Sequence, residues 1–457
     1  MDAFKDKRIL IAGLGKSGTA AFDALVRSGS VPAVCDDRDI EKEEPLLFEK
    51  LLAAGAGRYF KGMPVPDEKW DYVIMSPGVP PSAPFAERAR ARGSVVIGEL
   101  ELSRRIGRGR YAAITGTNGK TTTTTLVGEI FRAAGLKTAV CGNIGTPVVS
   151  EAVDADDDTW LVTEVSSYQL ETIDGFRPKI AAVLNLTPDH MDRHKSMENY
   201  AAAKARLFEN QEADDVLIYN ADDEQVCSLI YGARSGKIPF SRTKVLAAGA
   251  FVSGGVIVFA DPAGNTVPVI GAEELRIPGA HNLENALASA AAAFAAGVDH
   301  DVTAKVLKEF KGVEHRLEFV AEVDGVRFVN DSKGTNPDAS VKAIDAVGNN
   351  ILLIAGGYDK DADFTDYVRA AKGRVKKFLL LGTTAEKIRN CALAEGFAPG
   401  DVIVAGSMEK AVSLGREYAE PGDTVLLSPA CASWDMFKDF EERGDMFREL
   451  VLKYVRV

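Results

Sequence analysis

The feature that most limits the fold of this chain is the alternation of short apolar runs with helical stretches. Most of the runs end in Gly, Ser, Thr or Asp, and a helical pattern follows. Strands buried on both faces read as continuous apolar runs, so this alternation predicts an α/β fold with parallel sheets and crossover helices. The expected strands are residues 8–12, 72–75, 111–115, 161–165, 180–184, 216–219, 326–329, 351–355, 378–381 and 424–427.

The motifs fall into three blocks, and the length of 457 residues allows two to four domains. With boundaries near Glu99 and Gly312, we expect domains 1–99, 100–312 and 313–457. The first and third are expected to be Rossmann-like and the second a P-loop ATPase-type α/β domain. Short β-like pieces within 245–278 predict a small antiparallel insertion, and the Ala-rich run 285–296 predicts a buried helix.

Charge and cysteine content indicate the compartment and the kind of partner. Lys and Arg total 54 against 66 Asp and Glu, a net charge of −12, which disfavours nucleic acid and anionic membranes as partners. Residues 1–5 contain no apolar signal segment, and the apolar stretch 245–260 is shorter than the ~20 residues of a spanning helix. The five cysteines form no CxxC pair. We therefore expect a soluble cytoplasmic protein with no membrane or nucleic-acid partner.

A first glycine-rich loop follows the strand at 8–12. Gly13-Leu14-Gly15-Lys16-Ser17-Gly18 matches the GxGxxG dinucleotide fingerprint, and Asp36 and Asp37 come about twenty residues later. Taken alone, the motif is compatible with an NAD site, with the pyrophosphate of another nucleotide, or with a plain tight turn. Residues 76–78, Ser-Pro-Gly, end another strand that could line the same crevice.

A second glycine-rich loop, Gly116-Thr117-Asn118-Gly119-Lys120-Thr121, lies between a strand and a threonine-rich helix. This order predicts a P-loop, although Ile114 stands where the usual spacing has its first glycine. Backbone N–H groups would hold phosphates, Lys120 would neutralise them, and the Thr121 hydroxyl would bind Mg²⁺.

Three residues further along could complete such a site. Glu164 ends the strand at 161–165, where a carboxylate would serve as another Mg²⁺ ligand. His190 lies in Asp189-His190-Met191-Asp192 and could bind a metal, although a lone histidine is more often structural. Lys204, on an expected helix facing back, is by spacing alone an ordinary solvated lysine.

Several strings resemble the Mur ligases, the ATP-dependent amino-acid ligases of peptidoglycan synthesis. They run through the whole chain, at residues 115–121, 142–145, 164–170, 189–192, 279–285, 330–336 and 428–435, together with Phe437, Phe440, Arg443 and Gly444. The C-terminal strings are most similar to members that add D-glutamate. The resemblance implies that the chain joins D-glutamate to UDP-N-acetylmuramoyl-L-alanine with ATP and two Mg²⁺ ions, through an acyl phosphate, and that it is a monomer.

The resemblance also implies roles for individual residues. The first loop would bind the UDP-sugar substrate rather than NAD, through Gly15, Lys16, Ser17, Asp36, Asp37, Arg38, Ser76, Pro77, Gly78 and Asn143. ATP would be bound by Gly116, Thr117, Asn118, Gly119, Lys120, Thr121, Thr122, Asn282, Arg316 and Asp331. The metal ligands would be Thr121, Glu164, His190 and carbamylated Lys204. The groups acting on the reacting atoms would be Lys120, His190, Lys204, Arg316 and Lys333. D-Glutamate would be bound by Thr335, Lys360, Ser433 and Phe440.

Two departures from the family pattern leave the amino-acid site open. Tyr358 and Asp359 stand in the variable loop Gly356-Gly357-Tyr358-Asp359-Lys360. Trp434 is larger than the aliphatic residue expected there, so it either packs on the substrate or fills a gap in the core.

Other functions also fit parts of the pattern. Another ligase of the same superfamily is disfavoured by residues 428–435 and Lys360, and an NAD-dependent oxidoreductase or a P-loop switch protein would explain one loop each. No residue is assigned as the base that deprotonates the attacking amine.

Overall fold

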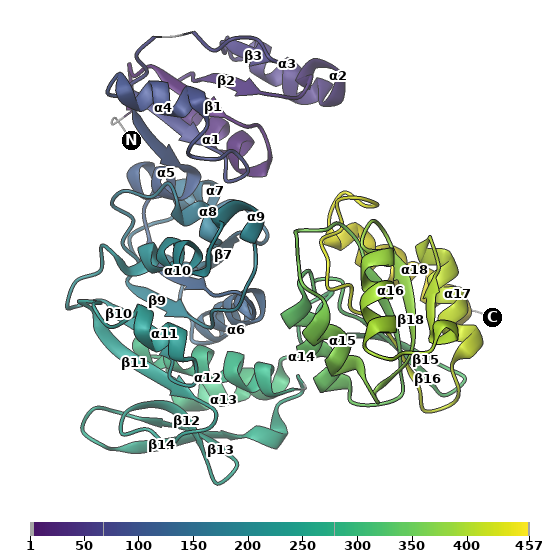
Figure 1. The fold of residues 1–457 in the computed structure, drawn as a ribbon. Coiled ribbons are helices and arrows are strands. Elements are labelled where there is room, and N and C mark those ends of the chain that lie inside the picture. The colour runs from purple at the N-terminus through teal and green to yellow at the C-terminus, as the bar shows by residue number, and fades with distance from the viewer. Residues whose placement is uncertain (1–3, 67, 278, 456–457) are drawn as a thin grey trace. The chain divides into compact units, whose positions relative to one another are not determined.

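The computed structural model describes residues 4–66, 68–277 and 279–455. Residues 1–3, part of the N-terminal segment used above, and Pro278, the end of the expected insertion, lie outside the described residues. Across the described residues the strands form three sheets, and each sheet falls inside one of the expected domains (Figure 1).

The first sheet has the order β3-β2-β1-β4-β5, and every paired neighbour is parallel. This is the doubly wound order expected of a Rossmann-like domain, which places the ends of β1 and β4 side by side at the switch point. Its strands are β1 Ile9–Ala12, β2 Ala33–Asp36, β3 Arg58–Phe60, β4 Tyr72–Met75 and β5 Val95–Gly98. Its helices are α1 Lys16–Arg27, α2 Ile40–Glu43, α3 Pro45–Ala53 and α4 Pro84–Ala91.

The second sheet has the order β14-β13-β12-β11-β10-β9-β6-β8-β7, with parallel pairing from β7 through to β12. Its strands are β6 Arg110–Thr115, β7 Thr138–Gly142, β8 Trp160–Glu164, β9 Ile180–Val183, β10 Val216–Asn220, β11 Gly236–Ser241, β12 Gly249–Ser253, β13 Val256–Ala260 and β14 Thr266–Gly271. The helices between residues 99 and 309 are α5 Glu99–Ile106, α6 Lys120–Ala133, α7 Val148–Asp154, α8 Ser167–Leu170, α9 Met191–His194, α10 Met197–Ala205, α11 Glu224–Leu229, α12 Ala280–Ala295 and α13 His300–Glu309.

The expected insertion at 245–278 is partly confirmed. Strands β12 and β13 pair antiparallel, but β12 also pairs parallel with β11, so the segment extends the main sheet rather than forming a separate one. The Ala-rich run is helical, as predicted, and the side chains of residues 286–293 are buried.

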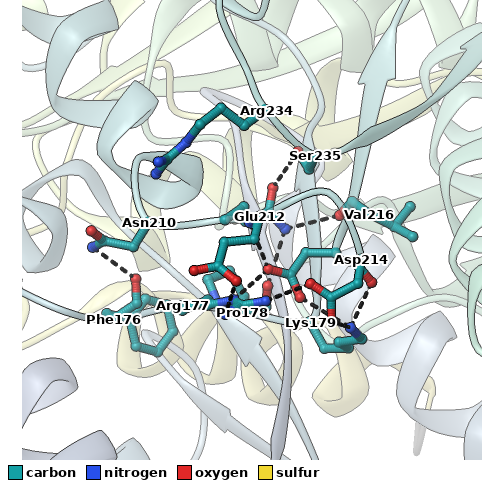
Figure 2. Close-up of polar contacts among 12 residues, drawn as sticks. Phe176, Arg177, Pro178, Lys179, Asn210, Glu212, Asp214, Val216, Arg234 and Ser235 are labelled. Atoms are coloured by element: carbon teal, nitrogen blue, oxygen red, sulfur yellow. Dashed lines mark hydrogen bonds and ion pairs between the residues drawn. The ribbon is translucent and has the colours of Figure 1, made fainter.

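The amino ends of β9 and β10 are tied together by an ionic network. Arg177 Nε lies 2.5 Å from Asp215 Oδ2. Lys179 Nζ lies 2.7 Å from Asp214 Oδ2 (Figure 2). Gln211 Nε2 donates to the carbonyls of Pro178 and Val216, both at 3.0 Å. This network joins the amino ends of the strands, on the side of the sheet opposite the P-loop. The carboxyl ends of the strands, where the P-loop lies, take no part in it.

The third sheet has the order β15-β16-β20-β17-β18-β19, and only the edge pair β15–β16 is antiparallel among the described pairings. Its strands are β15 Glu318–Val323, β16 Val326–Asn330, β17 Ile351–Gly356, β18 Val375–Leu381, β19 Val402–Val404 and β20 Thr424–Leu427. Its helices are α14 Pro337–Val347, α15 Thr365–Ala371, α16 Ala385–Ala394, α17 Met408–Tyr418 and α18 Phe440–Val455.

The chain divides into two compact units. The first comprises residues up to 186 with 198–270 and 286–307, and the second comprises 187–197, 271–285 and 308–457. The first two sheets therefore belong to one unit, where α5 and α7 contribute Leu102, Ile106 and Val149 to the core of the first sheet. No helix in the described part of the chain is long and apolar enough to cross a membrane.

Candidate active site

The first glycine loop lies at the carboxyl edge of its sheet and is held by Asp36. The Asp36 carboxylate accepts the Leu14 N–H at 2.7 Å, and Arg38 donates to both of its oxygens. Burial by itself would raise the Asp36 pKa, but Arg38 and the backbone donors outweigh burial and lower it. Asp36 thus stabilises the loop from behind, whereas its neighbour Asp37 is exposed.

The predicted crevice beside this loop is formed by the end of β4. The Ser76 N–H donates to the Ala12 carbonyl at 2.9 Å. A Cβ on Gly13, whose φ is +86°, would come within 2.9 Å of the Ser76 Cβ. The sequence placed Ser76 and the glycine loop in one crevice, and the structure brings them into contact.

The second loop has the geometry of a phosphate site with a hard-cation site beside it. Gly119, in the left-handed region with φ of +83°, begins α6, so Lys120 and Thr121 occupy the first turn. The Thr121 hydroxyl donates to Glu164 Oε2 at 2.7 Å. The Lys120 ammonium donates to the Gly116 and Thr117 carbonyls at 2.9 and 2.7 Å. A hydroxyl and a carboxylate at a helix N-terminus are the oxygen ligands that Mg²⁺ takes beside bound phosphate.

Two asparagines support this arrangement. The Asn143 amide donates to Glu164 Oε1 at 2.8 Å, so it holds the carboxylate that the sequence assigned to metal binding. Asn185, at the end of the neighbouring strand β9, accepts the Asn118 N–H at 2.8 Å and donates back to the Asn118 carbonyl at 3.1 Å. Sequence reasoning gave Asn143 only a substrate role and Asn185 none; polar residues directly after adjacent parallel strands were the available signal.

Lys204 is buried under the second loop. Its side chain is on α10, is 1% exposed, and its Nζ donates to the Gly116 carbonyl at 2.8 Å. The same nitrogen lies 4.6 Å from the Tyr200 ring centroid. A lysine this deep in the fold is not the solvated side chain that spacing alone suggested.

His190 and Lys360 belong to the second unit, and Asp189 lies beside both. His190 Nε2 is 3.6 Å and Lys360 Nζ 3.4 Å from an Asp189 oxygen, and Asn336 Nδ2 donates to Asp189 Oδ2 at 3.1 Å. Thr335, His190 and Lys360 line one cavity of about 560 Å³ in this unit. Metal binding by His190 together with Thr121, Glu164 and Lys204 stays a prediction.

Asp331 and Arg316 lie close together in the third sheet's domain. Asp331 is fully buried, accepts the Ser428 hydroxyl at 2.8 Å, and lies 3.8 Å from Arg316 Nη1. Burial raises the Asp331 pKa to about 6, against the opposing effect of Arg316. Both carboxylate oxygens are already engaged, since the Leu317 N–H donates to the other one at 3.3 Å. Ribose binding by Asp331 therefore stays a prediction.

The remaining predicted residues of this domain are organised by Arg443, which was part of the family resemblance but had no role assigned to it. Its buried guanidinium donates to the Ser332 hydroxyl and carbonyl at 2.9 and 2.7 Å, and to the Cys431 and Ala432 carbonyls at 3.1 and 3.2 Å. It therefore joins the segments that carry Lys333 and Ser433. Lys333 Nζ lies 4.6 Å from the Phe440 ring centroid, which brings those two predicted residues together.

Two further expectations concern Asn282 and Trp434. Asn282 is buried at the start of α12, where its Oδ1 accepts the Asn285 amide at 3.1 Å. Trp434 is 60% exposed, so the alternative that it fills a gap in the core is wrong.

Comparisons of the chain with known protein families agree with a phosphate-binding site of this kind. Three family models match: the MurD-like N-terminal domain at residues 7–98, the Mur ligase middle domain at 114–293, and the Mur ligase glutamate ligase domain at 315–431. A curated protein of Pelotomaculum thermopropionicum, named UDP-N-acetylmuramoylalanine–D-glutamate ligase, is 51% identical, with 98% of each chain covered. The chain belongs to the Mur ligase family.

Other Mur ligases extend the comparison. A Thermoanaerobacter protein with the same name is 46% identical, with 99% of each chain covered. The structure of UDP-N-acetylmuramate-alanine ligase from Thermotoga maritima has a TM-score of 0.59 at 19% identity, over 98% of this chain and 99% of that one. A pseudomurein peptide ligase from Methanothermus fervidus has a TM-score of 0.58 at 18% identity, covering 98% and 100%. The last two show the fold alone, and they confirm the three-domain α/β architecture of a Mur ligase.

Proposed function

We propose that this Mur ligase joins D-glutamate to UDP-N-acetylmuramoyl-L-alanine, with conversion of ATP to ADP and phosphate. The observation that carries the proposal is the Thr121–Glu164 contact of 2.7 Å beside Lys120, at the helix N-terminus after the second glycine loop. That arrangement suits Mg²⁺-ATP, and the names of the full-length relatives support the choice of the other two substrates.

Amide formation from a carboxylate requires activation of that carboxylate. The γ-phosphoryl group passes from ATP to a carboxylate oxygen, and the bond from γ-phosphorus to the bridging oxygen breaks. The D-glutamate amine then attacks the acyl phosphate, forms the C–N bond and expels phosphate. Because two anions must approach each other in the first step, cationic side chains such as Lys120 stabilise its transition state.

The residues present fit a divalent cation. A Mg²⁺ ion would neutralise phosphate charge, and Thr121 and Glu164 would hold it, with Asn143 orienting the carboxylate. Among the described residues, no group of three or more His, Cys, Asp and Glu side chains is placed to hold a metal. A site completed by phosphate oxygens and water needs no such group. A second Mg²⁺, held by His190 and Lys204, is part of the proposal.

Each domain takes one substrate in this proposal. Residues 1–99 bind the UDP-sugar, 100–312 bind ATP, and 313–457 bind D-glutamate, in a cytoplasmic monomer. Thr335, Lys360, Ser433 and Phe440 hold the amino acid, and Arg316 and Lys333 stabilise charge on the transferred phosphoryl group. Their common location in one unit supports this division.

Phosphate release with different acceptors tests the function. With UDP-N-acetylmuramoyl-L-alanine and ATP present, we expect release with D-glutamate and none with L-alanine, L-lysine or meso-diaminopimelate. Release with one of the latter instead would identify a different ligase of the superfamily. Release that needs no amino acid would identify a P-loop switch protein.

Carbamylation of Lys204 has its own test. The neutral amine adds to CO₂ and loses a proton, which gives an anionic carbamate on a side chain that is buried in the fold. We expect Lys204→Ala to abolish activity and formate or acetate to restore part of it, while Lys237→Ala, which removes a surface amine, changes neither. Full activity of Lys204→Ala would contradict the assignment.

A further inference from the structure

The two residues that depart from the family pattern contact each other. The Tyr358 and Trp434 rings lie 5.6 Å apart between centroids with their planes tilted by 52°, although 76 positions separate them in the chain. The two backbones meet at the same place, because the Tyr358 N–H donates to the Ala432 carbonyl at 2.9 Å. A Cβ on Gly357 would come within 2.2 Å of that carbonyl, so the close approach requires glycine.

The segments that carry this aromatic pair are fixed by the residue that follows each ring. Asp359 Oδ2 accepts the Lys387 ammonium at 2.8 Å, and Asp435 Oδ2 accepts the Thr383 N–H at 2.8 Å. Each aromatic residue therefore stands next to an anchored aspartate. Yet Tyr358 is 43% and Trp434 60% exposed. Folding of the domain leaves a large part of each residue exposed, and this exposure on a fixed frame suits contact with a ligand.

The pair lies at the predicted amino-acid pocket. Tyr358 lines the same cavity of about 560 Å³ as Thr335, Lys360 and Cys431. Trp434 directly follows Ser433, which is buried and whose carbonyl accepts the N–H groups of Met436 and Phe437. The aromatic pair thus bridges the two segments expected to bind the amino acid, and its Tyr358 member faces the cavity.

We propose that Tyr358 forms an apolar wall of the amino-acid pocket and sets the length of the side chain the pocket accepts, with Trp434 as the positioning residue that holds the Tyr358 ring. The wall packs against the methylene groups of an acidic amino acid whose carboxylate binds Lys360. In the structure an Asp189 carboxylate oxygen lies 3.4 Å from the Lys360 ammonium, so Asp189 makes one of the polar contacts of this ammonium. The proposal rests on the proposed function, since it concerns the D-glutamate pocket.

Steady-state kinetics of three variants test the wall. We expect Tyr358→Ala to raise the KM for D-glutamate about tenfold with kcat nearly unchanged, because it removes packing made equally in the ground and transition states. The same variant should accept D-2-aminoadipate, which is one methylene longer, better than the wild type does. Trp434→Leu should also raise the KM for D-glutamate and improve the use of D-2-aminoadipate, but by less than Tyr358→Ala does. The double variant should match Tyr358→Ala, because Trp434 acts through Tyr358. Tyr231→Ala, which removes an 88% exposed ring elsewhere, is the control.

Tryptophan fluorescence gives a readout that a purely structural role would not produce. Of the three tryptophans, Trp70 and Trp160 are 6% and 7% exposed, so Trp434 dominates any solvent-sensitive emission. We expect D-glutamate to shift the emission of the wild type, the shift to weaken in Tyr358→Ala, and no shift in Trp434→Leu.

The outcomes separate this inference from the proposed function. If the wild type releases no phosphate with D-glutamate, the proposed function is wrong. If the wild type uses D-glutamate but Tyr358→Ala keeps its KM and its selectivity, only the aromatic wall is wrong. Additive effects in the double variant would overturn the positioning role of Trp434.

Discussion

Two adjacent aspartates after β2 have different environments. Asp36 is bound by Arg38 and the Leu14 N–H, whereas Asp37 is exposed. The family resemblance implied the same role for both, beside the UDP substrate. The contacts show that Asp36 supports the loop and that Asp37 is exposed, and UDP binding by either aspartate stays a prediction.

This difference predicts opposite results for Asp36→Ala and Asp37→Ala. Asp36→Ala leaves the Arg38 guanidinium without its main partner and the Leu14 N–H without an acceptor, so we expect a loss of about 1–3 kcal/mol in the stability of the first domain. Asp37→Ala should leave thermal unfolding unchanged and raise the KM for the UDP substrate with little change in kcat. Thermal unfolding and KM measured on the same two preparations check this. Equal melting temperatures for the two variants would contradict the structural role of Asp36.

At the scale of an element, the first glycine loop depends on one close contact. A Cβ on Gly18, inside α1, would come within 1.8 Å of the Gly13 carbonyl, whereas a Cβ on Gly15 meets nothing within 4 Å. Gly15 has φ of −72°, which any residue can adopt. The two glycines therefore have different reasons to be present: Gly18 for the packing of the helix on the loop, and Gly15 for access to a ligand.

Substitution of each glycine by alanine separates these reasons. We expect Gly18→Ala to lower the melting temperature, because the loop must move away from the helix. Gly15→Ala should keep the wild-type melting temperature and raise the KM for the UDP substrate, since its methyl group projects toward the expected pyrophosphate. A stable Gly18→Ala protein with wild-type KM would show that the loop relaxes without cost.

Helix α7 begins at a buried carboxylate. Glu99 Oε1 accepts the Val149 N–H at 2.6 Å, and burial raises the Glu99 pKa from 4.5 to about 7. Nearby Tyr111 and Cys141 are also buried, which raises their pKa values, so neither titrates near neutrality. Between pH 4.5 and about 7, Glu99 therefore takes up a proton when the chain folds.

The direction of the pH effect follows from that uptake. The folded-state pKa exceeds the unfolded value, so the contribution of Glu99 is most favourable below pH 4.5 and is lost as the pH rises through about 7. The change is of the order of 3 kcal/mol at most. Glu99→Gln, which stays neutral, should flatten the fall in melting temperature of the first unit between pH 5 and 8. An unchanged pH dependence in Glu99→Gln would exclude Glu99 as its source.

At the scale of the whole molecule, the two units hold different parts of the chemistry. Lys120, Thr121, Glu164 and Lys204 belong to the first, and Thr335, Lys360, Ser433 and Phe440 to the second. Although the chain has a net charge of −12, each unit carries cationic side chains among its predicted site residues. These are Lys120 and Lys204 in the first unit, and Arg316, Lys333 and Lys360 in the second.

This division predicts selective stabilisation by ligands. In calorimetry of the full chain we expect separable transitions for the two units. A non-hydrolysable ATP analogue with Mg²⁺ should raise the melting temperature of the first unit, which carries the phosphate loop, and D-glutamate should raise that of the second unit, because each ligand stabilises the folded unit that carries most of its predicted contacts. Trp434→Phe, read by fluorescence, would follow the first unit alone through Trp70 and Trp160. D-Glutamate stabilisation of the first unit would contradict the division.

The sequence by itself determined many of the strands, the fold class and the phosphate loop, because these depend on local patterns: apolar runs buried on both faces, and glycines between a strand and a helix. It also placed Lys120 and Thr121 at the start of the helix after one strand and Glu164 at the end of another strand, and a parallel sheet brings these positions to one edge. Only the tertiary structure decided what depends on contacts between distant segments. It joined β12 to the main sheet, bound Asp36 behind its loop, buried Lys204 and Arg443, and set Tyr358 against Trp434. Such contacts depend on how helices and strand ends pack in space, and that packing leaves no periodic signal along the chain.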